Sequence, residues 1–325
     1  MTLGPFQPCT DDLAPGDRGV LDASWESFTL ERLRSPRDEM FDEAFGRLWR
    51  EFGERGEMER REVIEDRLSW DPRRPVDGHA LLYEMLVVKR DHQVVAVRDH
   101  TAIVTPAVLA GEAGAGVVVH LSHVLVEPSM RGRGLASWLR ALPVETARRC
   151  LALARSPRAQ ARGDAGAAAP GEDRRIVADR DSIGAAATAP GITLVAEMEL
   201  DDGQTPAVVA RLRSYAKAGF RVVDPRRVPY SQPDFRSAAE IDRSGVRPVP
   251  LCLVLRRVGR ENEFRITGEE LRGIVGALQA MFAVHVRADH MESVRELAAG
   301  MPSAGDEVDL LVPGSPSTLT REAIR

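Results

Sequence analysis

The chain is poor in cysteine, which argues against a fold held by disulfides and against a cysteine-based metal site. Its 325 residues contain three cysteines, Cys9, Cys150 and Cys252, which lie far apart in the sequence. They form no CxxC pair and suggest no disulfide framework. A reducing cytoplasm is therefore the default location, and nothing in the cysteine pattern indicates a metal.

Long apolar runs are also missing. No stretch approaches the ~18 uninterrupted apolar residues that a transmembrane helix needs. Residues 1–19 have neither a basic start nor an apolar centre, as a secretory signal would. We therefore expect no membrane partner and a cytoplasmic protein.

An excess of positive charge is absent as well. The formal net charge is −5, so no general attraction to nucleic acid is implied. The basic residues are nearly all arginine, with Lys89 and Lys217 as the lysines. Together with the abundance of alanine, this usage indicates a GC-rich genome rather than a function, and we expect no nucleic-acid partner.

The sequence does contain enough apolar residues, 43%, for a proper core. Their spacing predicts alternating strands and helices. Strands are expected at residues 25–33, 81–104 (two strands around a turn near Asp91), 116–128, 191–200, 220–224 and 248–258; helices are expected at 35–52, 58–68, 134–155, 208–218, 267–282 and 291–299. Pro143 predicts a kink in the helix over 134–155.

This order of elements predicts one mixed α/β domain over residues 25–258. Residues 1–24 are rich in Gly, Pro and Asp and are expected to be flexible. Residues 156–190 show little periodicity, which predicts an inserted, mobile loop. Residues 259–325 are expected to form a helical extension and a polar tail.

The stretch from Ser122 to Leu142, "SHVLVEPSMRGRGLASWLRAL", combines a strand, a cationic loop and the start of a helix. The first N–H groups of a helix lack partners, and the helix dipole is positive there. Gly132 and Gly134 would let backbone approach a phosphate closely, and Arg131 and Arg133 add positive charge. The natural ligand of such a site is a pyrophosphate.

Two motifs give this chain a resemblance to the GNAT acetyltransferase superfamily. The segment Arg131-Gly132-Arg133-Gly134-Leu135-Ala136 resembles the family's acyl-CoA-binding motif Q/R-x-x-G-x-G/A. "YAKAGF", from Tyr215 to Phe220, resembles the family's YxxxGF helix ending. The resemblance covers about residues 26–258 and implies a mixed, mostly antiparallel central sheet flanked by helices.

The resemblance also implies an activity, the transfer of an acetyl group from acetyl-CoA to an amine by direct attack in a ternary complex. The backbone of Val124, Leu125 and Val126 would bind the pantetheine arm and stabilise the oxyanion, while residues 131–136 bind the phosphates. Tyr215 matches the tyrosine that protonates the leaving thiolate, and packing against the sheet is its alternative role. The chain departs from the family at Val208, where an asparagine is often found, and at Pro143.

The general base is less defined by the sequence. Strict alternation along the strand places His120 and Ser122 on one face and His123 on the other, which argues against a shared metal. An imidazole suits proton removal at neutral pH, so His120 is the first candidate. A half-buried structural histidine is the alternative, and His123, Glu197 and Glu199 are further candidates for the base.

The acceptor site is expected between the first helices and the segment over 228–235. Trp49, Tyr230 and Gln232 could line a substrate pocket there, or simply belong to the core and to a turn. Two other functions stay open: a non-catalytic acyl-CoA sensor or scaffold, and an RNA-binding protein, which would need repeats and interleaved aromatics. The expected partners are acetyl-CoA and an amine-bearing acceptor, and a homodimer is left open.

Overall fold

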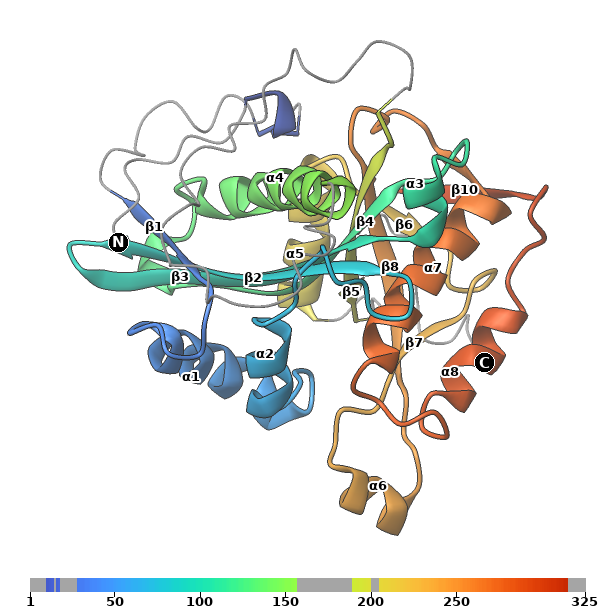
Figure 1. Cartoon of the computed structure of the whole chain (residues 1–325). Coiled ribbons are helices and arrows are strands. Elements are labelled where there is room, and N and C mark those ends of the chain that lie inside the picture. The colour runs from blue at the N-terminus through green and yellow to red at the C-terminus, as the bar shows by residue number, and fades with distance from the viewer. Residues whose placement is uncertain (1–9, 15, 18–27, 157–188, 200–204, 315–325) are drawn as a thin grey trace.

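The structure, a computed structural model, describes residues 10–14, 16–17, 28–156, 189–199 and 205–314. Its centre is a mixed sheet in the order β1-β2-β3-β4-β5-β8-β6-β10-β9, with β7 paired to β8 (Figure 1). Every neighbouring pair is antiparallel except β4 and β5. The strands are β1 Thr29–Leu33, β2 Ala80–Arg90, β3 Gln93–Val104, β4 Val117–Val126, β5 Ile192–Met198, β6 Arg221–Val223, β7 Tyr230–Gln232, β8 Val249–Arg257, β9 Arg265–Thr267 and β10 Glu307–Leu311.

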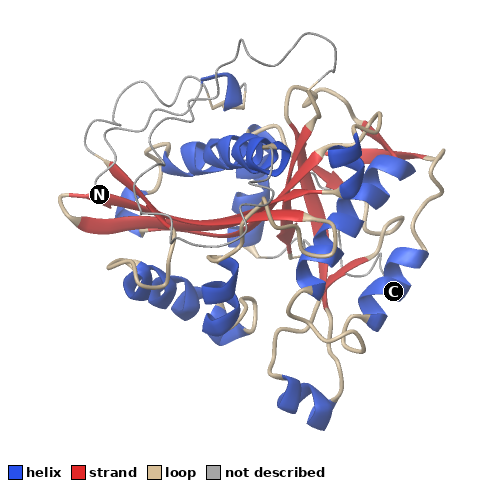
Figure 2. Ribbon diagram, in the orientation of Figure 1, coloured by secondary structure: helices blue, strands red, loops and turns tan. Residues whose placement is uncertain are grey.

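Helices cover both faces of this sheet (Figure 2). They are α1 Phe41–Glu51, α2 Arg61–Arg67, α3 Pro106–Ala110, α4 Leu135–Arg155, α5 Pro206–Lys217, α6 Ala238–Ser244, α7 Gly268–Ala283 and α8 Glu292–Ala299. Figure 1 shows α4 on one side of the long strands β2 and β3, and α1 and α2 on the other. The core clusters agree: α4 and α5 pack on one face, whereas α1, α2 and α7 pack on the opposite face.

The predicted fold class is confirmed: a mixed, mainly antiparallel sheet is flanked by helices. The long strands β2 and β3 are buried on both faces because helices cover both. Their turn at Asp91 and His92 takes positive φ angles. The predicted strand at 25–33 is described from Thr29, and the helix over 134–155 is α4, with Pro143 inside it. The short elements α3, α6, β7, β9 and β10 are not predicted from the sequence, because three to seven residues carry little periodicity.

The C-terminal residues are more deeply integrated than a helical extension would be. The predicted helices are present as α7 and α8, but β10 also pairs with β6 and so widens the central sheet. Leu271 and Leu278 of α7 are fully buried in the same cluster as Leu253 of β8. The residues beyond 258 therefore complete the core of the domain rather than follow it.

Part of the segment over residues 1–24, which is expected to be flexible, contacts the domain. The carboxylate of Asp12 accepts two hydrogen bonds from Arg148 of α4, at 2.6 and 2.7 Å. Leu13 and Ala14 are buried, so apolar contact and ion pairing both hold this segment to the domain. Residues 1–9 and 18–27, and residues 157–188 of the predicted insertion, lie outside the described residues.

Candidate active site

The parallel strands β4 and β5 pair over only four positions. The ladder begins at Val117 opposite Ile192 and ends at His120 opposite Val195. Beyond that point β4 continues along β3 as far as Val126, and β5 continues along β8 as far as Met198. The two strands therefore part in the middle of the sheet, and the side of β4 that faces β5 is released from the ladder at residues 121–126.

The glycine-arginine loop follows the released end of β4. Gly132 and Gly134 have φ angles of +76° and +81°, in the left-handed region that glycine occupies without strain. Gly134 is the N-cap of α4 and has no side chain to cap the helix, and a Cβ atom built on Gly132 would meet nothing within 4 Å. Arg131 and Arg133 are exposed. The predicted combination of accessible backbone, positive charge and a helix N-terminus is thus present in one place.

A β-bulge lies in β4 at the point where the strands part. Asp99 of β3 is opposite His123, but Thr101 is opposite His120, so three steps along β4 match two steps along β3. The extra residue reverses the alternation that follows it. The expectation that His120 and His123 lie on opposite faces is therefore wrong: both face the side of the sheet covered by α1, α2 and α7.

Contacts on both histidines fix this orientation. The His120 ring meets Phe282 of α7 edge-on, with centroids 5.5 Å apart. The His123 ring lies 4.9 Å from that of Phe52, just after α1, and its Nε2 is 3.1 Å from the carbonyl oxygen of Glu57. Although they share a face, no group of three or more potential metal-ligating His, Cys, Asp or Glu side chains occurs among the described residues.

His120 belongs to a chain of polar side chains that crosses the gap between the strands. Its Nε2 lies 2.8 Å from a carboxylate oxygen of Glu197 on β5, and the Ser122 hydroxyl lies 3.1 Å from its Nδ1. The other oxygen of Glu197 accepts a hydrogen bond of 2.5 Å from the Tyr230 hydroxyl. Burial, followed by the negative charge of Glu197, raises the pKa of Tyr230 well above its usual value, so the phenol stays protonated and donates.

His123 forms a separate buried pair with Asp99. Its Nδ1 lies 3.0 Å from Asp99 Oδ1, whose carboxylate also accepts a 3.0 Å hydrogen bond from the Tyr83 hydroxyl. Burial alone would lower the pKa of His123, but the charge of Asp99 and its hydrogen bond raise it to about 9. Burial alone would raise the pKa of Asp99, but attraction and hydrogen bonds from His123 lower it. At neutral pH His123 is a cation with no free basic nitrogen.

Tyr215 lies on the opposite face of the sheet, on α5. Its ring meets Phe220 edge-on at 4.8 Å, and the guanidinium of Arg140 on α4 lies 5.8 Å from its centroid. The ring is buried, with 8% of its surface exposed. Tyr215 therefore lies on the face of the sheet opposite to the one that carries the His120–Glu197 pair.

The three residues expected at the acceptor site are not equivalent. Tyr230 is buried and reaches Glu197, as described above, and Gln232 is buried in β7. Trp49 stacks on Phe45 at 5.7 Å and its ring lies against Gly53, which places it in the packing of α1. The structure therefore connects only Tyr230 directly to the polar chain at the gap.

Two acidic residues of the α1–α2 connection, Glu57 and Glu59, are not predicted from the sequence. Burial raises the pKa of Glu57, and the nearby negative charge of Glu199 raises it further. Glu59 is buried and forms a 2.5 Å ion pair with Arg67 of α2. The apolar periodicity of the sequence gives no sign of these positions. They lie in a connection between two helices, and only the tertiary fold brings Glu57 close to Glu199 at the end of β5.

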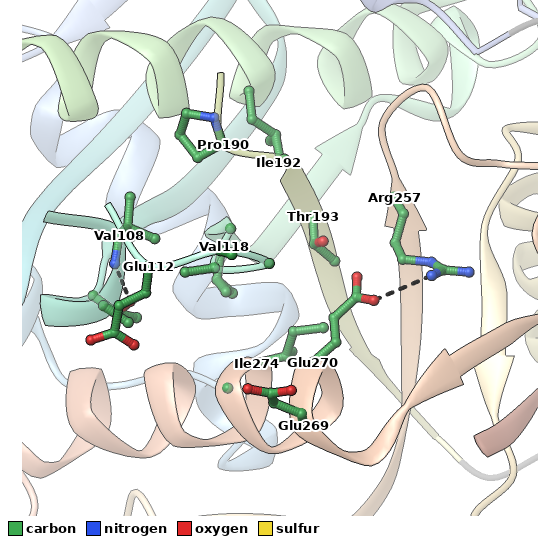
Figure 3. Close-up of a pocket in the computed structure, with 18 of the residues that line it drawn as sticks. Val108, Glu112, Val118, Pro190, Ile192, Thr193, Arg257, Glu269, Glu270 and Ile274 are labelled. Atoms are coloured by element: carbon green, nitrogen blue, oxygen red, sulfur yellow. Dashed lines mark hydrogen bonds and ion pairs between the residues drawn. The ribbon is translucent and has the colours of Figure 1, made fainter. Parts of the chain in front are cut away.

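A cavity of about 890 Å³ lies elsewhere, at the opposite end of β4 and β5 from the glycine-arginine loop. Its walls come from α3, the start of β5 and the first turns of α7, and none of the residues expected to bind CoA lines it. Figure 3 shows Thr193 on one side and Glu269 and Glu270 on the other, with Glu270 joined to Arg257. We locate the candidate active site at the strand gap instead, because the bulge lies where β4 and β5 part and the loop follows the released end of β4.

Comparison with known proteins gives a partial structural likeness. No family model and no curated protein matches the sequence. The putative acetyltransferase yncA from Salmonella typhimurium, solved with its cofactor acetyl-CoA, is 16% identical with a TM-score of 0.25. A tandem GNAT protein from the clavulanic acid biosynthesis pathway, solved without AcCoA, is 18% identical with a TM-score of 0.33. These structural neighbours are GNAT acetyltransferases.

The matched regions are limited in extent. They cover 54% and 84% of this chain, and 65% and 64% of the two solved chains, so the chain spans slightly less than two thirds of either neighbour. Within the described part of the chain, no helix combines the length and the apolar character needed to cross a membrane.

Proposed function

We propose that this protein is an N-acetyltransferase that moves an acetyl group from acetyl-CoA to an amine in a ternary complex. The parting of β4 and β5 beside the glycine-arginine loop is the observation that carries this proposal. The loop offers an anion site at the surface. Next to it, the backbone of β4 that no longer pairs with β5 can form hydrogen bonds to an extended ligand.

In this proposal, each part of acetyl-CoA binds to a particular group of this chain. The pyrophosphate lies against the backbone N–H groups after Gly132 and at the start of α4, with Arg131 and Arg133 nearby. Leu135 is buried, so it and Ala136 contribute through the backbone. The pantetheine arm then follows Val126, Leu125 and Val124 into the sheet and brings the thioester to the gap.

The reaction needs a base on one face and an acid on the other. Glu197 accepts a hydrogen bond from Nε2 of His120, which leaves Nδ1 as the basic nitrogen next to the Ser122 hydroxyl. His120 takes the amine proton through that hydroxyl, the amine nitrogen attacks the thioester carbonyl, and backbone N–H groups of β4 stabilise the oxyanion. The C–S bond then breaks and Tyr215 protonates the thiolate.

His123 and Glu199 fit the role of base less well. The pKa of about 9 keeps His123 protonated at neutral pH. Glu199 forms a 2.9 Å ion pair with Arg211, which occupies its carboxylate. His120 is therefore the proposed base, and Glu197 is its positioning residue.

Binding of acetyl-CoA to the loop tests the first half of the proposal. Gly134→Glu places a bulky anion where the phosphates are expected, so calorimetry should show a loss of acetyl-CoA affinity of roughly 100-fold or more. Gly305→Glu makes the same chemical change at an exposed glycine outside the site and should leave affinity unchanged. Melting curves show whether each variant is folded, and equal affinities in both folded variants would contradict the site.

Turnover tests the second half. Release of free thiol from acetyl-CoA should depend on an added amine, and a panel of small amines, polyamines and lysine peptides identifies the acceptor class. Tight acetyl-CoA binding without thiol release on any amine would favour a non-catalytic acyl-CoA sensor. Salt-sensitive RNA binding that CoA does not displace would instead favour the RNA-binding alternative.

A further inference from the structure

Arg98 lies in the middle of β3 and is 1% exposed. Its side chain points to the face covered by α4 and α5, and its Nε and Nη1 atoms are buried with no hydrogen-bond partner among the described residues. Other buried arginines of the described chain do have partners. Arg256, 2% exposed, meets the carboxylate of Glu261 at 2.9 Å. Arg67, 1% exposed, also has a buried Nε and Nη1 without a partner, but its Nη2 meets the carboxylate of Glu59 at 2.5 Å.

An unpartnered guanidinium is costly in a protein interior, because burial removes water without supplying a replacement. Burial lowers the pKa of Arg98 to about 10, so the side chain remains a cation at neutral pH. The carboxylate that acts on Arg98, Asp99, is already engaged: it pairs with His123 on the opposite face. The other cation that acts on Arg98, Arg140, has its own partner in Asp17 at 3.5 Å, so Arg98 is the cation left without a carboxylate.

Arg98 lies close to the place where the acyl group of the proposed co-substrate is expected. Arg98 is directly opposite Val124 in the β3–β4 ladder. It is also close enough to Tyr215 for the two side chains to interact electrostatically. The phosphates of CoA lie at the exposed loop and cannot reach a side chain buried under α4. The thioester, by contrast, is expected between Val124 and Tyr215, so the group within reach of Arg98 is the acyl chain.

We propose that Arg98 binds the free carboxylate of a short dicarboxylic acyl group, so that the protein accepts malonyl-CoA- or succinyl-CoA-type donors. A carboxylate can accept two parallel hydrogen bonds from the planar guanidinium and neutralise its charge at the same time. An acetyl group ends in a methyl group and has no carboxylate that could pair with Arg98. This inference rests on the proposed function, because it takes the acyl-CoA site at β4 as given, and it names the donor class for that site.

Binding of matched acyl-CoA pairs to the full-length protein tests the inference. Succinyl-CoA and butyryl-CoA have acyl chains of equal carbon number and differ in the terminal charge. A charge-assisted hydrogen bond contributes about 1.5–3 kcal/mol, so succinyl-CoA should bind the wild type about 10- to 100-fold more tightly. Arg98→Met should reduce this ratio to about one or below, and Arg98→Lys should restore only part of it because the two-pronged geometry is lost.

Thermal melting without ligand gives a second readout. Because Arg98→Met removes an uncompensated buried charge, it should leave the melting temperature unchanged or raise it. Arg256→Met, which removes a buried but paired arginine from the same face, should lower the melting temperature and keep the succinyl-CoA preference. A large drop in stability for Arg98→Met would show that the guanidinium is already paired within the protein, and would overturn the inference.

The outcomes separate this inference from the proposed function. If the wild type binds free CoA but does not prefer succinyl-CoA to butyryl-CoA, the assignment of Arg98 fails and the acetyltransferase proposal stands. If the preference persists in Arg98→Met, another group binds the carboxylate and the inference also fails. If neither CoA nor any acyl-CoA binds, the proposed function fails, and the donor class fails with it.

Discussion

Tyr215 is the single residue whose proposed role can be separated most cleanly from packing. Its hydroxyl is expected to meet the sulfur only as the C–S bond breaks, so the interaction strengthens in the transition state. Tyr215→Phe keeps the ring between Phe220 and Arg140 while removing the proton donor. We expect kcat to fall by roughly 100-fold, with acyl-CoA affinity nearly unchanged. Steady-state kinetics and a binding titration measure the two effects; a wild-type kcat would remove Tyr215 as the acid.

The buried pair of His123 and Asp99 predicts a pH dependence of stability. The folded pKa of His123, about 9, exceeds the unfolded value of about 6.5. Its contribution is therefore fully present below about pH 6.5 and is lost as the pH rises through 9. Asp99, whose folded pKa is depressed, contributes above its unfolded pKa of about 3.9 and loses that contribution as pH falls through its folded value. The melting temperature should thus decline from about pH 7 to about pH 9.

Asp99→Asn tests the origin of that decline. Removing one member of a buried ion pair should cost about 3 kcal/mol or more near neutral pH. Without the carboxylate, the pKa of His123 is no longer raised, so the decline between about pH 7 and about pH 9 should disappear. Urea unfolding across this range measures both effects. An unchanged slope in the variant would assign the pH dependence to other groups.

At the scale of elements, the bulge in β4 shows why strict alternation in the sequence does not always predict which face of the sheet a side chain occupies. The predicted limits of this strand, 116–128, are close to Val117–Val126. Yet one extra residue between His120 and His123 brings both rings to one face, and only the ladder with β3 shows it. Glu197 was a candidate base and is instead the partner of His120 and Tyr230, because the pairing of distant strands decides which side chains meet.

The first turn of α7 offers an element-scale prediction with a control in the same helix. A Cβ atom on Gly268 would lie 1.9 Å from the carbonyl oxygen of Ser303, whereas one on Gly273 would meet nothing within 4 Å. Gly268→Ala should push α7 away from the segment before β10 and lower stability by about 1–3 kcal/mol, as overpacking does. Gly273→Ala should raise stability by about 0.5–1 kcal/mol through helix propensity. Denaturant unfolding compares them, and equal effects would show that α7 does not pack closely there.

For the whole molecule, the sequence predicted the kind of fold but not its boundary. Helix and strand periodicity, together with two glycine-containing motifs, was enough to anticipate the mixed sheet and the loop at residues 131–136. The end of the domain at 258 came from the resemblance, which covers only that part. β9 and β10 have three and five residues and include Arg265, Glu307 and Asp309, so their polar composition hides their place in the sheet.

The position of β10 between β6 and β9 therefore predicts that the chain cannot be shortened to residues 1–258. Truncation would expose the apolar cluster beneath α7 and leave β6 as a sheet edge, which favours aggregation. We expect the shortened protein to be insoluble or to lack a cooperative melt.

A point variant in the full-length chain separates lost packing from lost length. Val308 of β10 is fully buried, so Val308→Asp places a charge in the core and should lower stability by about 3 kcal/mol or more. Its neighbour Asp309 is exposed, so Asp309→Asn should change stability by no more than about 0.5 kcal/mol. Both are measured by denaturant unfolding monitored by circular dichroism. If residues 1–258 alone melt cooperatively and Val308→Asp is neutral, β10 is an appendage and the sheet closes without it. If the truncation fails and Val308→Asp is strongly destabilising, β10 is part of the core that the domain needs in order to fold.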